Sequence, residues 1–182
     1  MKRKIFRFVC PILLIASPVF AQIQSLEMVK KESFVTYTLH HPLHTIEATS
    51  KDVDCKITAD RSSKEIKSVS AMVDVTTFDS GNSNRDSHAM EVIDALSYPE
   101  VDFMSTSVSQ VGDSLKVSGK MTFHGVTKDI VIPAACRWEN GKLTVQGKFD
   151  LSLTEFKIQR PSLLMMPTDD ALKFSFVAVF AL

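Results

Sequence analysis

The sequence lacks the clustered positive charge that binding to nucleic acids requires. Its 182 residues contain 21 Lys and Arg against 21 Asp and Glu, and no basic run occurs in the part of the chain after residue 7. Because proteins bind phosphate backbones through clustered Lys and Arg, a nucleic-acid partner is not expected. Internal repeats and low-complexity segments are also missing, and the length is that of a single domain.

No hydrophobic run is long enough to span a bilayer. The longest apolar stretch, residues 8–20, has 13 residues, whereas a spanning helix needs roughly 20. A positive start precedes this stretch and the small residue Ala21 follows it, which is the pattern of a secretory signal peptide. We therefore predict that residues 1–21 are a cleaved signal peptide and that residues 22–182 form a periplasmic or secreted domain. A buried helix and a membrane anchor are the alternatives.

Cysteine is scarce, and the sequence leaves open whether the remaining cysteines form a disulfide or stay free. The chain has three cysteines, of which Cys10 lies in the predicted signal peptide, so Cys55 and Cys136 remain. An exported protein can form a disulfide between them. Two buried free thiols are the other ordinary outcome for this residue type.

Sequence signatures of covalent catalysis are absent as well. The chain has Ser, His and Asp, but no Gly-x-Ser-x-Gly elbow and no cysteine-nucleophile signature. We therefore assign no catalytic residue, expect no cofactor, and predict a protein that is not an enzyme.

Most of the remaining sequence alternates apolar and polar residues, which indicates half-buried strands. Residues 53–60 are a clear case, because Val53, Cys55, Ile57 and Ala59 share one face. Asn140-Gly141 predicts a two-residue hairpin turn, since both residues tolerate positive φ. The pattern predicts an all-β domain of about eight antiparallel strands.

One stretch, residues 78–103, departs from this alternation and predicts a short helix. Asn82 or Asn84 can cap its start, and Glu91, Val92, Ala95 and Leu96 follow at helical spacing. Pro99 disfavours a helical conformation at the residue before it, so the helix should end by Tyr98.

A flat sheet of eight strands would leave two edges exposed, so we predict closure into a barrel. The second faces of the strands carry many charged residues, which argues against a lipid-facing outer surface and therefore against an outer-membrane barrel. These residues are Asp54, Lys56, Asp60, Lys67, Asp74, Lys116 and Lys120. The barrel should be apolar inside, where an eight-stranded barrel either fills with side chains or holds one small ligand.

Three ordered motifs of this sequence resemble those of the YceI family of periplasmic, lipocalin-like proteins. They are Asp79-Ser80-Gly81-Asn82 with Asn84-Arg85-Asp86-x-His88, then Tyr98-Pro99-x-Val101-x-Phe103, then Gly119-x-Met121-Thr122-Phe123-His124-Gly125-Val126-Thr127-Lys128. The resemblance covers roughly residues 30–182, and residues 39–47 depart from the family's usual first strands, so the chain is similar to an atypical member. It implies an eight-stranded lipocalin-like barrel that binds a polyisoprenoid or a similar long apolar lipid.

Two sets of residues are candidates for contact with such a lipid. The first set would line the barrel and consists of Val101, Phe103, Met121, Phe123, Phe149, Phe174 and Phe176. The second set is polar, would lie at the barrel mouth and would bind a head group through charge-assisted hydrogen bonds: Arg85, His88, His124 and Arg160. The alternative for His124 is a local role in the turn around Gly125.

Two other interpretations remain open. His40, His41 and His44, joined by His88 or His124, suggest the metal site of a metal-dependent enzyme or a metal carrier, although the first two point to opposite faces of an extended strand. The aromatic side chains also suit a filled barrel that acts as an interaction module. The expected function is that of an exported, soluble lipid-binding protein, whose partner is a long-chain apolar molecule.

Overall fold

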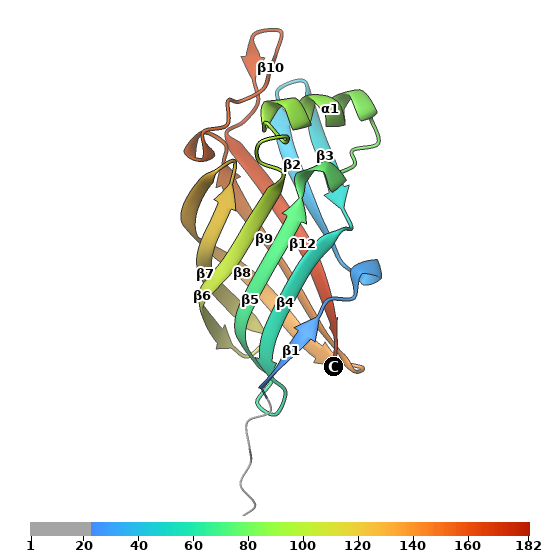
Figure 1. Ribbon diagram of the computed structural model, residues 1–182, viewed down its shortest axis with the longest axis vertical. Helices are drawn as coiled ribbons and strands as arrows, with labels where there is room; N and C mark the ends of the chain where they lie inside the picture. Colours follow the sequence, from blue (N-terminus) through green and yellow to red (C-terminus); the bar gives the residue numbers. More distant parts are fainter. Residues whose placement is uncertain (1–22) are drawn as a thin grey trace, which may run out of the picture.

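Most strands in the described part of the chain belong to one curled antiparallel sheet (Figure 1). The computed structural model describes residues 23–182, so the predicted signal peptide with Cys10 lies outside the described residues. The ten strands of the sheet follow the order β1-β4-β5-β6-β7-β8-β9-β12-β2-β3, and β10 pairs with β11 in a separate hairpin. The strands are β1 (Ile23–Glu27), β2 (Phe34–His41), β3 (His44–Ser50), β4 (Val53–Asp60), β5 (Glu65–Asp74), β6 (Glu100–Val111), β7 (Ser114–Phe123), β8 (Val126–Glu139), β9 (Lys142–Ser152), β10 (Ser162–Leu163), β11 (Met166–Pro167) and β12 (Ala171–Ala181).

The alternation of residue types determines which face of each strand is buried. In β7, Leu115, Val117, Met121 and Phe123 are buried, whereas Lys116 and Lys120 between them are exposed. Antiparallel pairing of sequential strands through short turns carries this pattern around the sheet. The predicted all-β, lipocalin-like architecture with an apolar interior is confirmed.

The sheet contains more strands than the sequence predicted, ten instead of about eight. One strand that the alternation did not reveal is β1. Only Leu26 of its five residues is buried, so its sequence has too little periodicity to indicate a strand. Its pairing with β4, from Ile23 opposite Asp60 to Glu27 opposite Lys56, determines its conformation.

Two sets of contacts join parts of the sheet that are distant in strand order. The Val29 N–H donates to the Val179 carbonyl at 2.7 Å, and the buried Ser33 hydroxyl accepts from the Val179 N–H at 3.0 Å. Further along, Thr49 and Asp79 exchange two backbone hydrogen bonds of 3.0 and 3.1 Å. These contacts satisfy backbone groups that a sheet edge would otherwise expose.

The helix α1 (Ser83–Val92) starts at the predicted place and ends earlier than predicted. Asn82 is its N-cap, and its side-chain oxygen accepts from the Arg85 N–H at 3.1 Å. The prediction extended the helix toward Tyr98, but Asp94 adopts a left-handed φ of 47° just after the Ile93 C-cap. The Ala95 N–H then bonds to the Met90 carbonyl at 3.0 Å, which completes a helix end of the Schellman type.

The two ends of the barrel carry different elements (Figure 1). We call one of them the α1 end, because α1 lies across it, and the β10–β11 hairpin projects beyond it. Three short 3-10 helices complete the described chain, η1 (Lys30–Glu32), η2 (Val75–Thr77) and η3 (Thr154–Phe156). Within residues 23–182, no helix has the length and apolar character needed to cross a membrane.

Candidate functional site

The barrel encloses an apolar cavity with a volume of about 260 Å³. This volume approaches the lower end of the range for small-molecule sites, roughly 300–1,000 Å³. Side chains from both sides of the curled sheet and from α1 form its wall. Of the 43 lining residues, only three have side chains that are ordinarily charged or titrate near neutrality: Arg85, His88 and Asp102. The structure therefore differs from a filled barrel.

All seven residues predicted to line the barrel lie in the cavity wall. Their strand positions explain this placement, because Val101 and Phe103 in β6 have the same parity, as do Phe174 and Phe176 in β12. Phe149 of β9 pairs with Phe174 in register, and the two rings stack with their centroids 5.1 Å apart. The aromatic rings thus lie along the wall instead of filling the interior.

Two glycines in the strands make room for these rings. A Cβ on Gly147 would lie 2.8 Å from the ring of Phe176 and 2.6 Å from the Pro133 carbonyl oxygen. A Cβ on Gly119 would lie 2.6 Å from the ring of Phe103. Contacts this short do not occur between real side chains, so a larger residue at either position would displace the ring or the backbone.

Helix α1 supplies two of the three charged or titratable residues of the cavity wall, and β6 supplies the third, Asp102. Arg85 and His88 line the cavity together with the apolar Met90 and Ile93. The Arg85 Nε atom is buried and has no hydrogen-bond partner within residues 23–182. A buried guanidinium N–H without an acceptor is costly, and a bound group with an acceptor oxygen would relieve this cost.

Tyr37 from β2 lies in the same part of the wall. Burial raises the pKa of the Tyr37 hydroxyl, the Asp86 carboxylate raises it further, and Arg85 opposes these effects. Its ring packs against Phe78 with a centroid distance of 5.3 Å. Asp86 itself accepts from the Ser80 N–H at 3.2 Å, which holds the start of α1 against the preceding turn.

His124 and Arg160, the other two residues predicted at the mouth, do not line the cavity. His124 Nδ1 donates to the Phe156 carbonyl at 3.1 Å, and the His124 ring packs against Tyr98 at 4.7 Å. Arg160 donates through Nε to the Thr168 carbonyl at 2.8 Å. Both side chains hold connections at the α1 end. For His124 this is the local role in the turn around Gly125, which the sequence also allowed.

The histidines near residue 40 do not converge on a metal site. His41 is buried, and its Nδ1 accepts a hydrogen bond from the Leu43 N–H at 3.2 Å. Its Nε2 therefore carries the proton, which it donates to the Met166 carbonyl at 2.9 Å. Both ring nitrogens are used, so neither lone pair is available to a metal. Over the described residues, no group of three or more His, Cys, Asp or Glu side chains is placed to hold a metal ion.

Cys55 and Cys136 are both free thiols, so the disulfide considered from the sequence is not formed. Cys55 lies in the cavity wall, where burial raises the pKa of its thiol to about 12. Cys136 is buried in β8, and burial raises its pKa as well. Both thiols are therefore neutral at physiological pH, and they act as small apolar side chains.

Several lining residues did not appear among the sequence candidates. Tyr37, Phe78, Met90 and Ile93 contribute to the cavity wall. Strand parity could have revealed Tyr37, which alternates with Val35 and Leu39. The α1 residues had no such signal, because the face that α1 turns to the cavity depends on how the helix lies across the barrel.

Comparisons with known proteins agree with this architecture. Residues 26–180 match the family model of the YceI-like domain. The chain is 26% identical to protein YceI of Escherichia coli O157:H7 over 138 residues, which cover 71% of this chain and 72% of that protein.

Solved structures with the same fold extend the comparison. BcnA of Burkholderia cenocepacia superposes with a TM-score of 0.75 at 19% identity and covers 84% of this chain and 98% of its own. A polyisoprenoid-binding domain from Saccharophagus degradans superposes with a TM-score of 0.68 at 12% identity and covers 86% and 97%, respectively. At these identities the likeness concerns the fold, whereas the domain model spans nearly the whole described chain. The chain belongs to the YceI family.

Proposed function

We propose that this protein binds one long apolar molecule of the polyisoprenoid type inside its barrel and that it acts as a carrier without catalysis. The observation that carries this proposal is the cavity of about 260 Å³ inside the barrel, whose wall is almost wholly apolar. Membership of the YceI family and the fold shared with a polyisoprenoid-binding domain support it.

The apolar wall can supply most of the affinity. Burial of about twenty methylene equivalents contributes on the order of 15 kcal/mol, at roughly 0.8 kcal/mol each. Lost translational freedom and ordering offset at least several kcal/mol of this gain. Micromolar binding corresponds to about 8 kcal/mol, so the hydrocarbon tail alone is sufficient where this offset stays below about 7 kcal/mol.

We propose that Arg85 and His88 determine which head group the bound ligand carries. Arg85 has a buried Nε without an acceptor, and His88 lies one helical turn further along α1 at the same cavity wall. A guanidinium favours hydroxyl, carboxylate or phosphate oxygens, and it binds the charged ones most strongly. The polar side chains would thus contribute selectivity, and the strands would contribute affinity.

Export is the second part of the proposal. The positive start, the short apolar stretch and Ala21 favour cleavage before Gln22, with the mature domain in the periplasm or outside the cell. The intact mass of the protein recovered from the exported fraction tests this step. A mass that includes residues 1–21 would contradict it.

A pair of neighbouring alanines in β8 allows a direct test of binding in the cavity. Ala134 lines the cavity, whereas Ala135 is exposed on the outer face of the barrel. We expect Ala134→Phe to weaken binding of all-trans-retinol, a fluorescent isoprenoid alcohol, by at least about tenfold, because the added ring occupies the space of the ligand.

The matched control, Ala135→Phe, should bind retinol as the wild type does. Thermal unfolding of both variants shows whether the domain is intact, since overpacking at Ala134 is expected to cost roughly 1–3 kcal/mol. Equal retinol affinity in the two folded variants would contradict binding inside the barrel.

A further inference from the structure

The β10–β11 hairpin ends in a turn whose residues do not suit its backbone. Leu163 pairs with Met166, so Leu164 and Met165 form a two-residue loop, and their φ angles are 52° and 62°. Two-residue turns with positive φ at both positions favour Asn and Gly, because a bulky side chain is strained there.

Two other turns of the barrel have the same geometry and the expected residues. Asn140–Gly141 has φ angles of 53° and 71°, and His124–Gly125 has φ angles of 49° and 69°. Each connects paired strands through two residues, as Leu164–Met165 does. The hairpin turn therefore keeps two large apolar side chains where these two turns have Asn or His followed by Gly, at a cost in local stability.

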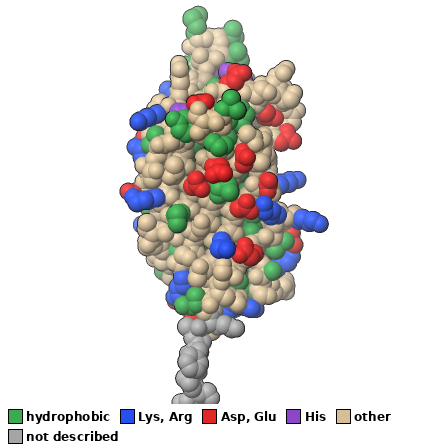
Figure 2. Space-filling model, viewed as in Figure 1, with side chains coloured by type: hydrophobic (Ala, Val, Ile, Leu, Met, Phe, Trp, Pro, Cys, Tyr) green, Lys and Arg blue, Asp and Glu red, His purple; other side chains and the backbone are tan. Residues whose placement is uncertain are grey.

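No packing within the described chain explains these side chains. Leu164 is 73% exposed and Met165 is 98% exposed, and the neighbouring Leu163 is 48% exposed. Hydrophobic side chains are visible at the tip of the projecting hairpin in Figure 2. Exposed apolar groups of this kind, gathered in one place, mark an interaction surface.

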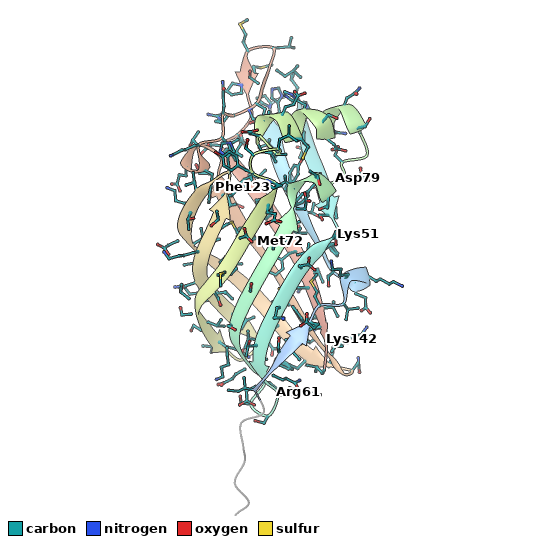
Figure 3. The ribbon with its side chains drawn as sticks, viewed as in Figure 1. Lys51, Arg61, Met72, Asp79, Phe123 and Lys142 are labelled. Atoms are coloured by element: carbon teal, nitrogen blue, oxygen red, sulfur yellow. The ribbon has the colours of Figure 1, made fainter. Side chains whose placement is uncertain are left out.

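Exposed apolar residues concentrate at this end of the barrel. Of eleven large apolar residues exposed within residues 23–182, six belong to segments at the α1 end: Leu43, Leu96, Tyr98, Leu163, Leu164 and Met165. The turns at the opposite end are polar, as Arg61 and the neighbourhood of Lys142 illustrate in Figure 3. Exposed large apolar side chains are thus more numerous at the α1 end, whereas the opposite end exposes Ile23 and Val111.

The hairpin is also continuous with the cavity and fixed to the barrel. Pro161, the residue before β10, lines the cavity. The Met166 carbonyl of β11 accepts the bond from buried His41, and the Pro161 carbonyl accepts from the Thr168 N–H at 2.8 Å. A ligand that entered or left at this end would pass the hairpin.

We propose that the tip formed by Leu163, Leu164 and Met165 inserts into the surface of a lipid bilayer, so that an apolar ligand passes between the bilayer and the cavity. This inference rests on the proposed function, because it concerns where the ligand comes from. A few projecting side chains suit shallow insertion into a bilayer, whereas a stable protein interface needs roughly 20–30 residues a side. Residues 157–170 carry two positive and two negative charges, Lys157, Arg160, Asp169 and Asp170, so no preference for anionic lipid is expected.

The decisive variant replaces the tip by a turn that the protein already contains. Leu164→Asn combined with Met165→Gly reproduces the sequence of the 140–141 turn, so the hairpin should form at least as well as in the wild type. We expect its partition onto phosphatidylcholine vesicles to fall by at least about tenfold, because two large apolar side chains are lost. Extraction of all-trans-retinol from those vesicles should slow by a similar factor.

Further measurements distinguish the role of the tip from the role of the cavity. Retinol binding from vesicle-free solution should stay within about twofold of the wild type in the double variant, since the cavity wall is unchanged. Val111→Asn removes another exposed apolar side chain, at the opposite end, and should leave vesicle binding unchanged. Leu43→Gln, on the adjacent turn, should weaken vesicle binding by about threefold, and it provides a second variant that does not depend on folding of the β10–β11 turn.

The outcomes distinguish failure of this inference from failure of the proposed function. Vesicle binding that is absent in the wild type, or equal in the double variant and the wild type, overturns the inference, whatever the affinity for retinol. A wild-type dimer in light scattering that becomes a monomer in the double variant also overturns it, because the tip is then a contact between copies. Tip-dependent vesicle binding without retinol binding in solution supports the inference and contradicts the proposed cavity function.

Discussion

At the scale of single residues, a contact between a glycine and an aromatic ring joins two of the three family motifs. A Cβ on Gly125 would lie 2.6 Å from the ring of Tyr98. Tyr98 belongs to the second motif and His124-Gly125 to the third, and the Tyr98 ring packs on both residues of this turn. These motif residues therefore stabilise the α1 end and do not line the cavity.

Gly125→Ala should destabilise the protein more than Gly141→Ala does. Both glycines have a left-handed φ near 70°, so both substitutions introduce backbone strain of about 1–2 kcal/mol. Only Gly125 also faces an aromatic ring, whereas a Cβ on Gly141 meets nothing within 4 Å. We expect a further loss of at least about 1 kcal/mol at Gly125, measured by urea unfolding.

Tyr98→Ala provides the control for this comparison. In that background the space above Gly125 is open, and the two alanine substitutions should cost about the same. An equal cost in the wild-type background would show that the ring contact has no energetic effect.

Features at the residue scale were predictable where the place of a residue in a strand or turn determines its surroundings. Strand alternation predicted the seven lining residues that lie in the cavity wall, and Asn140-Gly141 predicted a turn that forms with positive φ at both positions. The partners of His124 and Arg160 were not predictable. They are backbone carbonyls at Phe156 and Thr168, and a carbonyl has no residue-specific signal in the sequence.

At the scale of elements, the long connection between β9 and β12 depends on one carboxylate. Asp170 accepts from the Ser152 hydroxyl at 2.5 Å and from the Thr154 N–H at 2.9 Å, which fixes the start of η3. The Ser152 bond is the largest cause of a lowered pKa at Asp170, and the Thr154 N–H adds to it. The folded state therefore favours the charged carboxylate.

Asp170→Asn should lower the free energy of unfolding by about 1 kcal/mol at pH 7, which is the ordinary net value of a hydrogen bond. We expect no larger loss, because the carboxylate is partly exposed to solvent. Because the folded-state pKa lies below the ordinary value of 3.8, the wild-type contribution is complete above about pH 5 and is lost as the pH falls through the folded-state pKa. The stability difference between wild type and variant should therefore shrink between pH 5 and pH 2, as followed by thermal unfolding.

Asp169→Asn is the matched control, because the Asp169 side chain is exposed and only its backbone N–H bonds, to the His40 carbonyl. Its stability should stay within about 0.5 kcal/mol of the wild type at every pH. A pH-independent cost at Asp170 would contradict the assigned role of its charge.

The boundaries of elements show what local sequence can and cannot determine. The start of α1 was predictable from its asparagine caps, and Asn82 proved to be the cap. Its end was not, since Asp94 reverses the chain although no glycine stands there. Strand β1 depends on pairing with β4, about thirty residues away, and its own five residues carry too little pattern to reveal it.

At the scale of the whole molecule, the alternation predicted a barrel but not whether it is hollow. The same phenylalanines suit a filled core and a lined tunnel. The difference lies in how rings from opposite sides of the curled sheet lie against the wall, and Gly119 and Gly147 allow two of them to lie close to it. This arrangement depends on the curvature of the entire sheet, which no local pattern contains.

Native mass spectrometry of the protein purified without detergent tests the central claim most directly. If the cavity holds a long apolar molecule, the folded protein should appear at a mass above that of its polypeptide, and unfolding in organic solvent should release a hydrocarbon-rich molecule identifiable in the extract. Ala134→Phe should lose this extra mass while Ala135→Phe keeps it. A folded wild-type protein whose mass is that of the polypeptide alone, with an extract free of lipid, would contradict the account.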